Sequence, residues 1–184
     1  MDPLTQLGQV GPLLMSVTAG LTPDDLDRPT PCTGFTVRGV LEHMIGGATA
    51  FAAAYRGEAP GEPDLSDPRQ GLGVALGDLV AAVSAPGALD QTVAAPFGDV
   101  PGETFARFIA LDGLVHGWDM ATATGQAYEP SDDLVAAVDG FARGALDPLR
   151  DGDTFADAQD PAAGASPIER LAAYTGRRAV AATA

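Results

Sequence analysis

The chain has 184 residues, of which 46% are hydrophobic and 19% are charged, and its formal net charge is −15. This composition is typical of a folded globular protein and excludes a disordered chain. The strong negative charge excludes binding to nucleic acid or to anionic lipid through a basic face. The length predicts one domain over residues 1–184, large enough to bury a substantial core.

The cysteine content and the N-terminus indicate the compartment. A single cysteine, Cys32, cannot build a disulfide framework, and this is typical of a reducing environment. The N-terminal residues carry no basic region, and no apolar run in the sequence approaches the ~18 residues of a membrane-spanning helix. We therefore expect a cytoplasmic protein that is not bound to a membrane. We also expect it to act on a small molecule, as a monomer or a homodimer.

Apolar residues recur at helical spacing along most of the chain. The predicted long helices cover residues 3–19, 37–56, 71–85, 102–124 and 132–147. In the first of them, Leu4, Leu7 and Leu14 are expected to face the core. Thr36 and Ser131 have the residue type and the position of helix N-caps for the second and fifth helices.

The connections and the C-terminal region complete the predicted fold. The stretch "APGALDQTVAAPFGDVPGE" is rich in turn residues, and we expect a long, partly extended crossover there. After a loop over 148–165, Ser166 and Glu169 form the pattern of a capping box, and Gly176 ends a short helix. The predicted fold is all-α: an antiparallel four-helix bundle with a long crossover loop and a short C-terminal helix.

The fourth predicted helix, "FARFIALDGLVHGWDMATATGQ", carries three polar residues within its apolar stripe. At 100° per residue, Asp112, His116 and Asp119 all fall inside the arc of the buried side chains. A carboxylate buried among apolar residues costs several kcal/mol unless it is paired, protonated or bound to a metal. Because the chain contains no lysine, the partner is an arginine, a histidine or a cation.

The spacing of these residues is compatible with a metal site. Asp112 and His116 lie four residues apart, so both side chains can reach one point beside the helix. The only other histidine, His43, lies on the second predicted helix, at the border of its apolar face. Two imidazoles and one carboxylate suit Zn²⁺, Ni²⁺ or Fe²⁺ and leave a coordination position open. In the alternative interpretation, His116 is a core histidine that is hydrogen-bonded to Asp112.

Three segments together resemble a known family. They are "LDRPTPCTGFTVRGVLEHMIGG", "LDGLVHGWDMATATGQ" and "ASPIERLAAYTGR". In this order they resemble the actinobacterial metal-binding proteins of the mycothiol-dependent maleylpyruvate isomerase N-terminal family, in the DinB/YfiT-like superfamily. The resemblance covers nearly the whole chain, from about residue 20 to 178.

The resemblance implies a four-helix bundle that binds a divalent metal, usually zinc or nickel. The family's ligands are a histidine on the second helix and a Glu-x-x-x-His pair on a later one, and these positions correspond to His43, Asp112 and His116. Two residues depart from the family pattern. Asp112 stands where glutamate is usual and is one methylene shorter, and Phe35 stands where tryptophan is usual.

Three functions follow as hypotheses. The resemblance implies a metal-dependent enzyme, a transferase or isomerase that uses mycothiol as co-substrate, with His116 and Asp112 as catalytic residues. The second hypothesis is a metal-free isomerase, dehydratase or cyclase of secondary metabolism, in which the same two residues form a general acid/base pair. The third is a non-catalytic binding bundle whose buried polar residues are structural.

Further polar residues each allow two interpretations. Asp119 either orients His116 or an arginine through its carboxylate, or hydrogen-bonds to the backbone near the helix end. Trp118 is expected to pack under a loop. Cys32 is either a reactive thiol or a small buried hydrophobe. Three arginines are candidates for binding an anionic substrate or are simply solvated: Arg38, Arg170 and Arg177.

Overall fold

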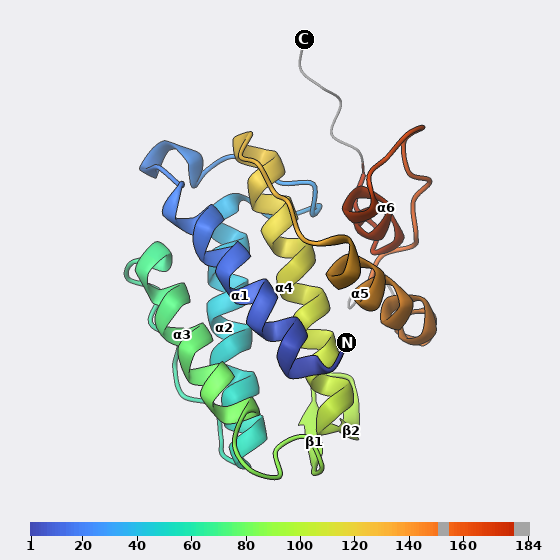
Figure 1. Cartoon of the computed structure of the whole chain (residues 1–184). Helices are drawn as coiled ribbons and strands as arrows, with labels where there is room; N and C mark the ends of the chain where they lie inside the picture. The colour runs from blue at the N-terminus through green and yellow to red at the C-terminus, as the bar shows by residue number, and fades with distance from the viewer. Residues whose placement is uncertain (151–154, 179–184) are drawn as a thin grey trace.

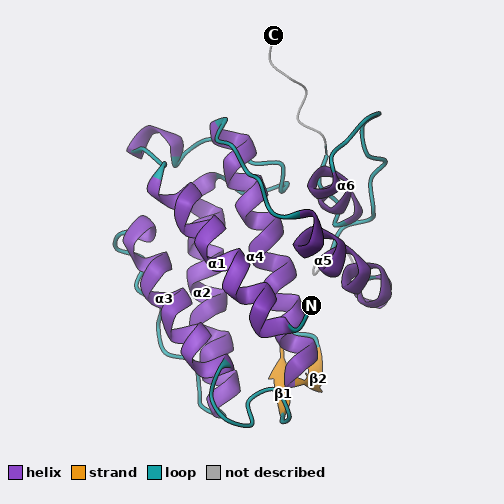
Figure 2. Ribbon diagram, in the orientation of Figure 1, coloured by secondary structure: helices purple, strands orange, loops and turns teal. Residues whose placement is uncertain are grey.

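The computed structural model describes residues 1–150 and 155–178, and these residues fold mainly into helices (Figure 1). The α-helices are α1 (Pro3–Ala19), α2 (Val37–Arg56), α3 (Pro68–Val83), α4 (Gly102–Thr124), α5 (Asp132–Ala145) and α6 (Pro167–Tyr174). Two short strands, β1 (Thr92–Ala95) and β2 (Gly98–Pro101), form an antiparallel hairpin (Figure 2). Single turns of 3₁₀-helix cover Pro23–Asp25 and Asp147–Leu149. The predominantly helical character is therefore confirmed, with a small sheet in addition.

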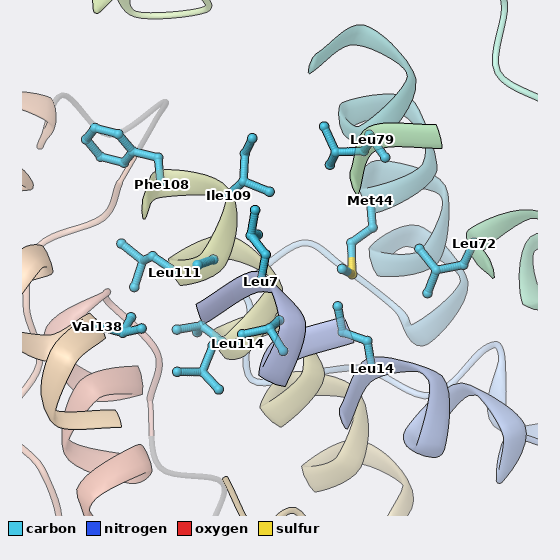
Figure 3. Close-up of a cluster of buried hydrophobic side chains, with 14 of the residues drawn as sticks. Leu7, Leu14, Met44, Leu72, Leu79, Phe108, Ile109, Leu111, Leu114 and Val138 are labelled. Atoms are coloured by element: carbon cyan, nitrogen blue, oxygen red, sulfur yellow. The ribbon is translucent and has the colours of Figure 1, made fainter. Parts of the chain in front are cut away.

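Helix α4 lies at the centre of the packing (Figure 1). It contacts α1, α2, α5 and α6, while α3 packs mainly on the outer side of α2. Leu14 of α1, Leu72 of α3 and Leu111 and Leu114 of α4 are fully buried in the shared core (Figure 3). Because α4 is surrounded by other elements, its polar side chains must find partners in the interior of the protein.

The predicted helix ends are confirmed by specific hydrogen bonds. The side chains of Thr36 and Ser131 each accept a bond from a backbone N–H in the first turn of α2 and α5. Ser166 and Glu169 form the predicted capping box of α6. At the C-terminus of α4, Gly125 adopts the left-handed conformation with φ of 70°, which glycine reaches without steric cost.

Two details of the predicted helices are wrong. Helix α3 begins at Pro68 instead of residue 71, because the side chain of Asp67 accepts bonds from two backbone N–H groups in the first turn. Leu4, expected in the core, is 39% exposed. It lies in the first turn of α1, at the edge of the buried face that Leu7 and Leu14 define.

The expected crossover between α3 and α4 contains the β-hairpin, which the helical periodicity of the sequence did not predict. Val93 pairs with Val100 in its register. The hydroxyl of Tyr55 near the end of α2 donates to the carbonyl of Gly102 at the start of α4 at 2.7 Å, and the side-chain amide of Gln91, directly before β1, donates to the carbonyl of Tyr55 at 2.8 Å. Phe97 lies in the turn and packs on the aromatic side chains of α4. The hairpin thus covers one end of the space between α2 and α4.

The remaining connections are irregular. The predicted loop 148–165 contains the end of the second 3₁₀ turn and no other helix in its described part, and its residues 151–154 lie outside the described residues. No helix within the described ranges combines the length and the apolar character that crossing a bilayer requires.

We predict that Gly117→Ala destabilises the protein by about 1–3 kcal/mol. A Cβ atom at Gly117 would lie 2.5 Å from the hydroxyl oxygen of Tyr128, which is held in place by a 2.9 Å bond to the carbonyl of Leu114. The matched control is Gly140→Ala in α5, where no atom lies within 4 Å of the added Cβ. This control should stabilise the helix by roughly 0.5–1 kcal/mol. Urea denaturation of both variants tests the prediction, and equal effects would contradict it.

Candidate metal centre

The structure brings His43, Asp112 and His116 together between α2 and α4. The Oδ1 atom of Asp112 lies 3.7 Å from Nε2 of His43 and 3.4 Å from Nε2 of His116. The centroids of the two imidazole rings are 4.9 Å apart, and the rings are inclined at 65°. One potential ligand atom from each of the three residues therefore falls within 4.8 Å of the other two.

This donor set fits a divalent ion of the zinc type. Two imidazole nitrogens and one carboxylate oxygen are common ligands of Zn²⁺ at catalytic sites, where a further position remains open. Around a tetrahedral ion with bonds of about 2.1 Å, the donor atoms stand about 3.4 Å apart. The distances from Asp112 to the two imidazoles, 3.7 and 3.4 Å, are close to this value. The aspartate is thus long enough to share an ion with both histidines.

The exposure of the three side chains differs from the prediction at one position. The apolar arc predicted a buried Asp112, yet 36% of its side chain is exposed, because a cavity lies beside this part of α4. His116 is buried, with 5% of its side chain exposed, and His43 is 42% exposed. The prediction that His43 lies at the border of the buried face of α2 is confirmed. The donor set is therefore anchored in the interior and open on one side.

The cavity has a volume of about 530 Å³. His43, Asp112 and His116 line one part of it, together with Cys32 and Arg177, while six phenylalanines are the largest group among the other lining residues. Both the β-hairpin and the segment that follows α6 contribute to its walls. A small molecule in this space would contact the three candidate ligands directly.

Asp119 holds His116 from the side opposite to Asp112. Its Oδ2 atom lies 3.0 Å from Nδ1 of His116 and 3.0 Å from Nη2 of Arg177, and Nε of Arg177 donates to it at 3.2 Å. The carboxylate is fully buried. Of the two interpretations of Asp119, the one in which it orients His116 and an arginine is confirmed. Donation from Nδ1–H to Asp119 leaves Nε2 of His116 directed toward Asp112.

The charges around the site reinforce one another. Burial lowers the pKa of His116, but the neighbouring Asp112 carboxylate and the hydrogen bonds to Asp112 and Asp119 outweigh it and raise the pKa to about 9. Burial raises the pKa of Asp112, but the imidazoles of His116 and His43 hold it well below its usual range. Without an ion, His116 is protonated at neutral pH and its proton occupies the nitrogen that would bind a metal.

A second group of potential ligands is less suited to a cation. Cys32, His116 and Asp119 also bring ligand atoms within 4.8 Å of one another. However, Nη2 of Arg177 lies 3.4 Å from Nδ1 of His116, so this group already contains a positive charge. Burial raises the pKa of the Cys32 thiol, although Arg177 opposes the effect. Cys32 is therefore a partly buried, protonated thiol in the cavity wall, and its geometry does not favour a reactive thiolate.

The other residues singled out in the sequence lie away from the cavity. The side chain of Arg38 is half exposed, 4.0 Å from Asp27, and Arg170 donates to the carbonyl of Ala165. Trp118 is half-buried and borders a small cleft with loop residues that precede α6, in agreement with the predicted packing under a loop. Of the three candidate arginines, only Arg177 lines the cavity.

Comparison with known proteins places these residues in a family. Residues 9–121 match the family model of the mycothiol maleylpyruvate isomerase N-terminal domain. The chain belongs to this family. Two proteins of Mycobacterium tuberculosis are each 34% identical to it over 186 residues, which cover 96% of this chain and 98% of theirs: Uncharacterized protein MT0763 of strain CDC 1551 / Oshkosh and Uncharacterized protein Rv0738 of strain ATCC 25618 / H37Rv. No solved structure matches the chain significantly.

The residues that match the family model end within α4, so they include the three candidate ligands and Asp119 but not Arg177. The sequence analysis did not predict the pairing of Arg177 with Asp119, or the part that Phe97 and Phe155 have in the cavity wall. One signal for Arg177 was present. The sequence predicts that Gly176 ends α6, and this glycine has a φ of 93° in the structure. Arg177 directly follows it, at the point where the chain leaves the helix and reaches Asp119.

We predict that Asp119→Asn lowers the free energy of unfolding by about 3 kcal/mol, because the buried guanidinium of Arg177 loses its carboxylate partner. The matched control is Asp139→Asn on α5, whose ion pair with Arg143 is partly exposed to solvent. It should cost about 1 kcal/mol or less. Urea denaturation at pH 7 measures both values. If Asp119→Asn lowers the free energy of unfolding no more than Asp139→Asn does, the buried ion pair contributes no more to stability than the partly exposed one.

Proposed function

We propose that this member of the family is a metal-dependent enzyme, a transferase or isomerase that uses mycothiol as co-substrate. His43, Asp112 and His116 would hold one divalent ion, Zn²⁺ or Ni²⁺, and His116 and Asp112 would face the substrate. The observation that carries the proposal is the convergence of the two imidazoles and the carboxylate at the wall of a cavity of about 530 Å³. Membership of a family named for a mycothiol-dependent isomerase supports the thiol co-substrate.

The packing of the helices supports the corresponding fold. We propose that α1, α2, α3 and α4 form the antiparallel bundle of DinB-like proteins, with α5 and α6 as additions on the outer side of α4. The contacts of α1 with α4, of α2 with α3 and of α2 with α4 favour this arrangement. It would explain why the ligands come from only two helices, since α2 and α4 face each other across the site.

Each residue has a distinct role in the proposed chemistry. An ion bound here would act as a Lewis acid that polarises a substrate oxygen or lowers the pKa of a thiol. Asp119 fixes the ring of His116, so that Nε2 remains directed toward Asp112. Asp112 supplies the negative charge that offsets part of the positive charge of the site. The phenylalanine side chains of the cavity exclude water from the substrate.

A metal-free enzyme is the second candidate. The distance of 3.4 Å between Nε2 of His116 and Oδ1 of Asp112, together with the raised pKa of His116, is compatible with a general acid/base pair. The two candidates differ in their response to metal. Removal of divalent ions would abolish the activity of the first and leave that of the second intact.

We predict that the protein takes up about one Zn²⁺ per chain with an affinity that depends on the three ligands. His43→Ala and Asp112→Asn should each weaken the binding by roughly 100-fold, since two remaining ligands hold an ion poorly. The matched control is Glu42→Gln, next to His43 on α2 and outside both groups of potential ligands. Competition titration with a chelator and elemental analysis after dialysis provide the measurements.

The control Glu42→Gln should bind Zn²⁺ as the wild type does. A wild-type protein that takes up neither Zn²⁺ nor Ni²⁺ would contradict the proposal. So would variants at His43 and Asp112 that bind as tightly as the control. His43→Ala is informative because the side chain is half exposed, and its loss should leave the fold intact.

We further predict that binding of Zn²⁺ at pH 7 releases about one proton per ion. The pKa of His116 is raised to about 9, so at pH 7 the metal must displace the proton on Nε2. The affinity should therefore increase from pH 6 to about pH 9 and then level off. Calorimetric titration in buffers with different ionisation enthalpies measures the release. At pH 10 the proton release should vanish, and a pH-independent affinity would count against His116 as a ligand.

A further inference from the structure

We infer that the cavity binds a predominantly apolar, ring-bearing organic molecule whose polar group lies beside His43, Asp112 and His116, and that a small dicarboxylic acid is not its preferred ligand. The inference deepens the proposed function and rests on it for the position of the polar group. It concerns the substrate class, for which the three ligands alone provide no information.

Six phenylalanines are the largest group of side chains in the cavity wall. They are Phe35, Phe51, Phe97, Phe105, Phe108 and Phe155. Four of them form an unbroken series of contacts, in which the ring centroids of Phe51 and Phe105 are 4.9 Å apart, those of Phe105 and Phe97 are 6.2 Å apart, and those of Phe97 and Phe108 are 4.7 Å apart. Such a surface offers both ring faces and ring edges to an aromatic or alicyclic ligand and offers nothing to a second charged group.

The charged groups of the cavity are confined to one end. Apart from the two histidines, Arg177 is the only described cationic residue that lines the cavity. Its guanidinium already donates to Asp119 through Nε and Nη2, and its Nη1 donates to the carbonyl of Thr175. A dicarboxylate with one carboxylate at the candidate metal centre would place the other against phenyl rings, where it loses its hydration without gaining a partner. The carboxylate of Asp112 adds repulsion.

The size of the cavity agrees with this interpretation. A volume of about 530 Å³ lies within the range of sites that enclose molecules with one or two ring systems. A four-carbon diacid would leave much of this space to water in contact with phenyl rings. The apolar wall therefore favours a ligand that displaces this water, and the binding affinity should increase with the apolar area of the ligand.

The test uses the full chain, both loaded with Zn²⁺ and treated with a chelator, and two probes with the same polar group, 2-naphthoate and maleate. Isothermal titration calorimetry should show that 2-naphthoate binds at least tenfold more tightly than maleate to the Zn²⁺-loaded protein. Phe97→Ala should weaken the binding of 2-naphthoate roughly five- to tenfold, the effect of losing one ring from an apolar contact. The binding of maleate should change little.

Phe141→Ala is the matched control. Phe141 contacts Phe108 at a centroid distance of 4.9 Å but does not line the cavity, so its removal should leave both affinities unchanged. Should Phe97→Ala fail to fold, Phe108→Leu removes a ring from the same wall and keeps an apolar side chain. Maleate binding as tightly as 2-naphthoate would overturn the inference. The same conclusion would follow if neither wall variant weakened the binding of 2-naphthoate.

Failure of this inference can be distinguished from failure of the proposed function. If the protein takes up Zn²⁺ and prefers maleate, the metal proposal survives and the apolar substrate class is wrong. If it takes up no Zn²⁺ but binds 2-naphthoate in a manner that depends on Phe97, the metal proposal fails and the apolar substrate class stands.

Discussion

The buried carboxylate of Asp119 is the constraint on which the candidate site depends. It has no exposed surface, and it is bonded to both His116 and Arg177. A charge without solvent in the centre of a helical protein is tolerated only with such partners. The interaction therefore fixes two things at once. It sets the orientation of the imidazole on α4, and it holds the segment after α6 against the same helix, although 58 residues separate Arg177 from Asp119 in the chain.

The candidate ligands could be predicted from the sequence because helical periodicity places Asp112 and His116 on one face, and His43 was the only other histidine. The helix ends could also be predicted, because N-cap residues such as Thr36 and Ser166 are signals within the local sequence. The hairpin could not be predicted, because its four-residue strands show no strong alternation of apolar and polar residues. They are stabilised by contacts with α2 and α4. The pairing of Arg177 with Asp119 depends on tertiary packing, about which helical periodicity says nothing.

The exposure of Asp112 is another feature that helical periodicity could not predict. Its position in the apolar arc was correct, but periodicity cannot distinguish a side chain that faces packed atoms from one that faces a cavity. The distances also answer the question raised by an aspartate in place of glutamate. The Oδ1 atom of Asp112 lies within 3.7 Å of Nε2 of His43 and 3.4 Å of Nε2 of His116, so the shorter carboxylate approaches both imidazoles in this backbone arrangement.

Some residues of the cavity wall lie within the part of the chain that matches the family model, and others lie beyond it. The three candidate ligands lie within the matched residues 9–121, whereas Phe155 and Arg177 belong to the chain beyond them. Five of the six phenylalanines of the wall also lie within the matched residues, so the segments around Phe155 and Arg177 complete a wall that the matched residues mostly form. A change at Phe155 or Ala156 would therefore alter the shape of the cavity without replacing any candidate ligand on α2 or α4.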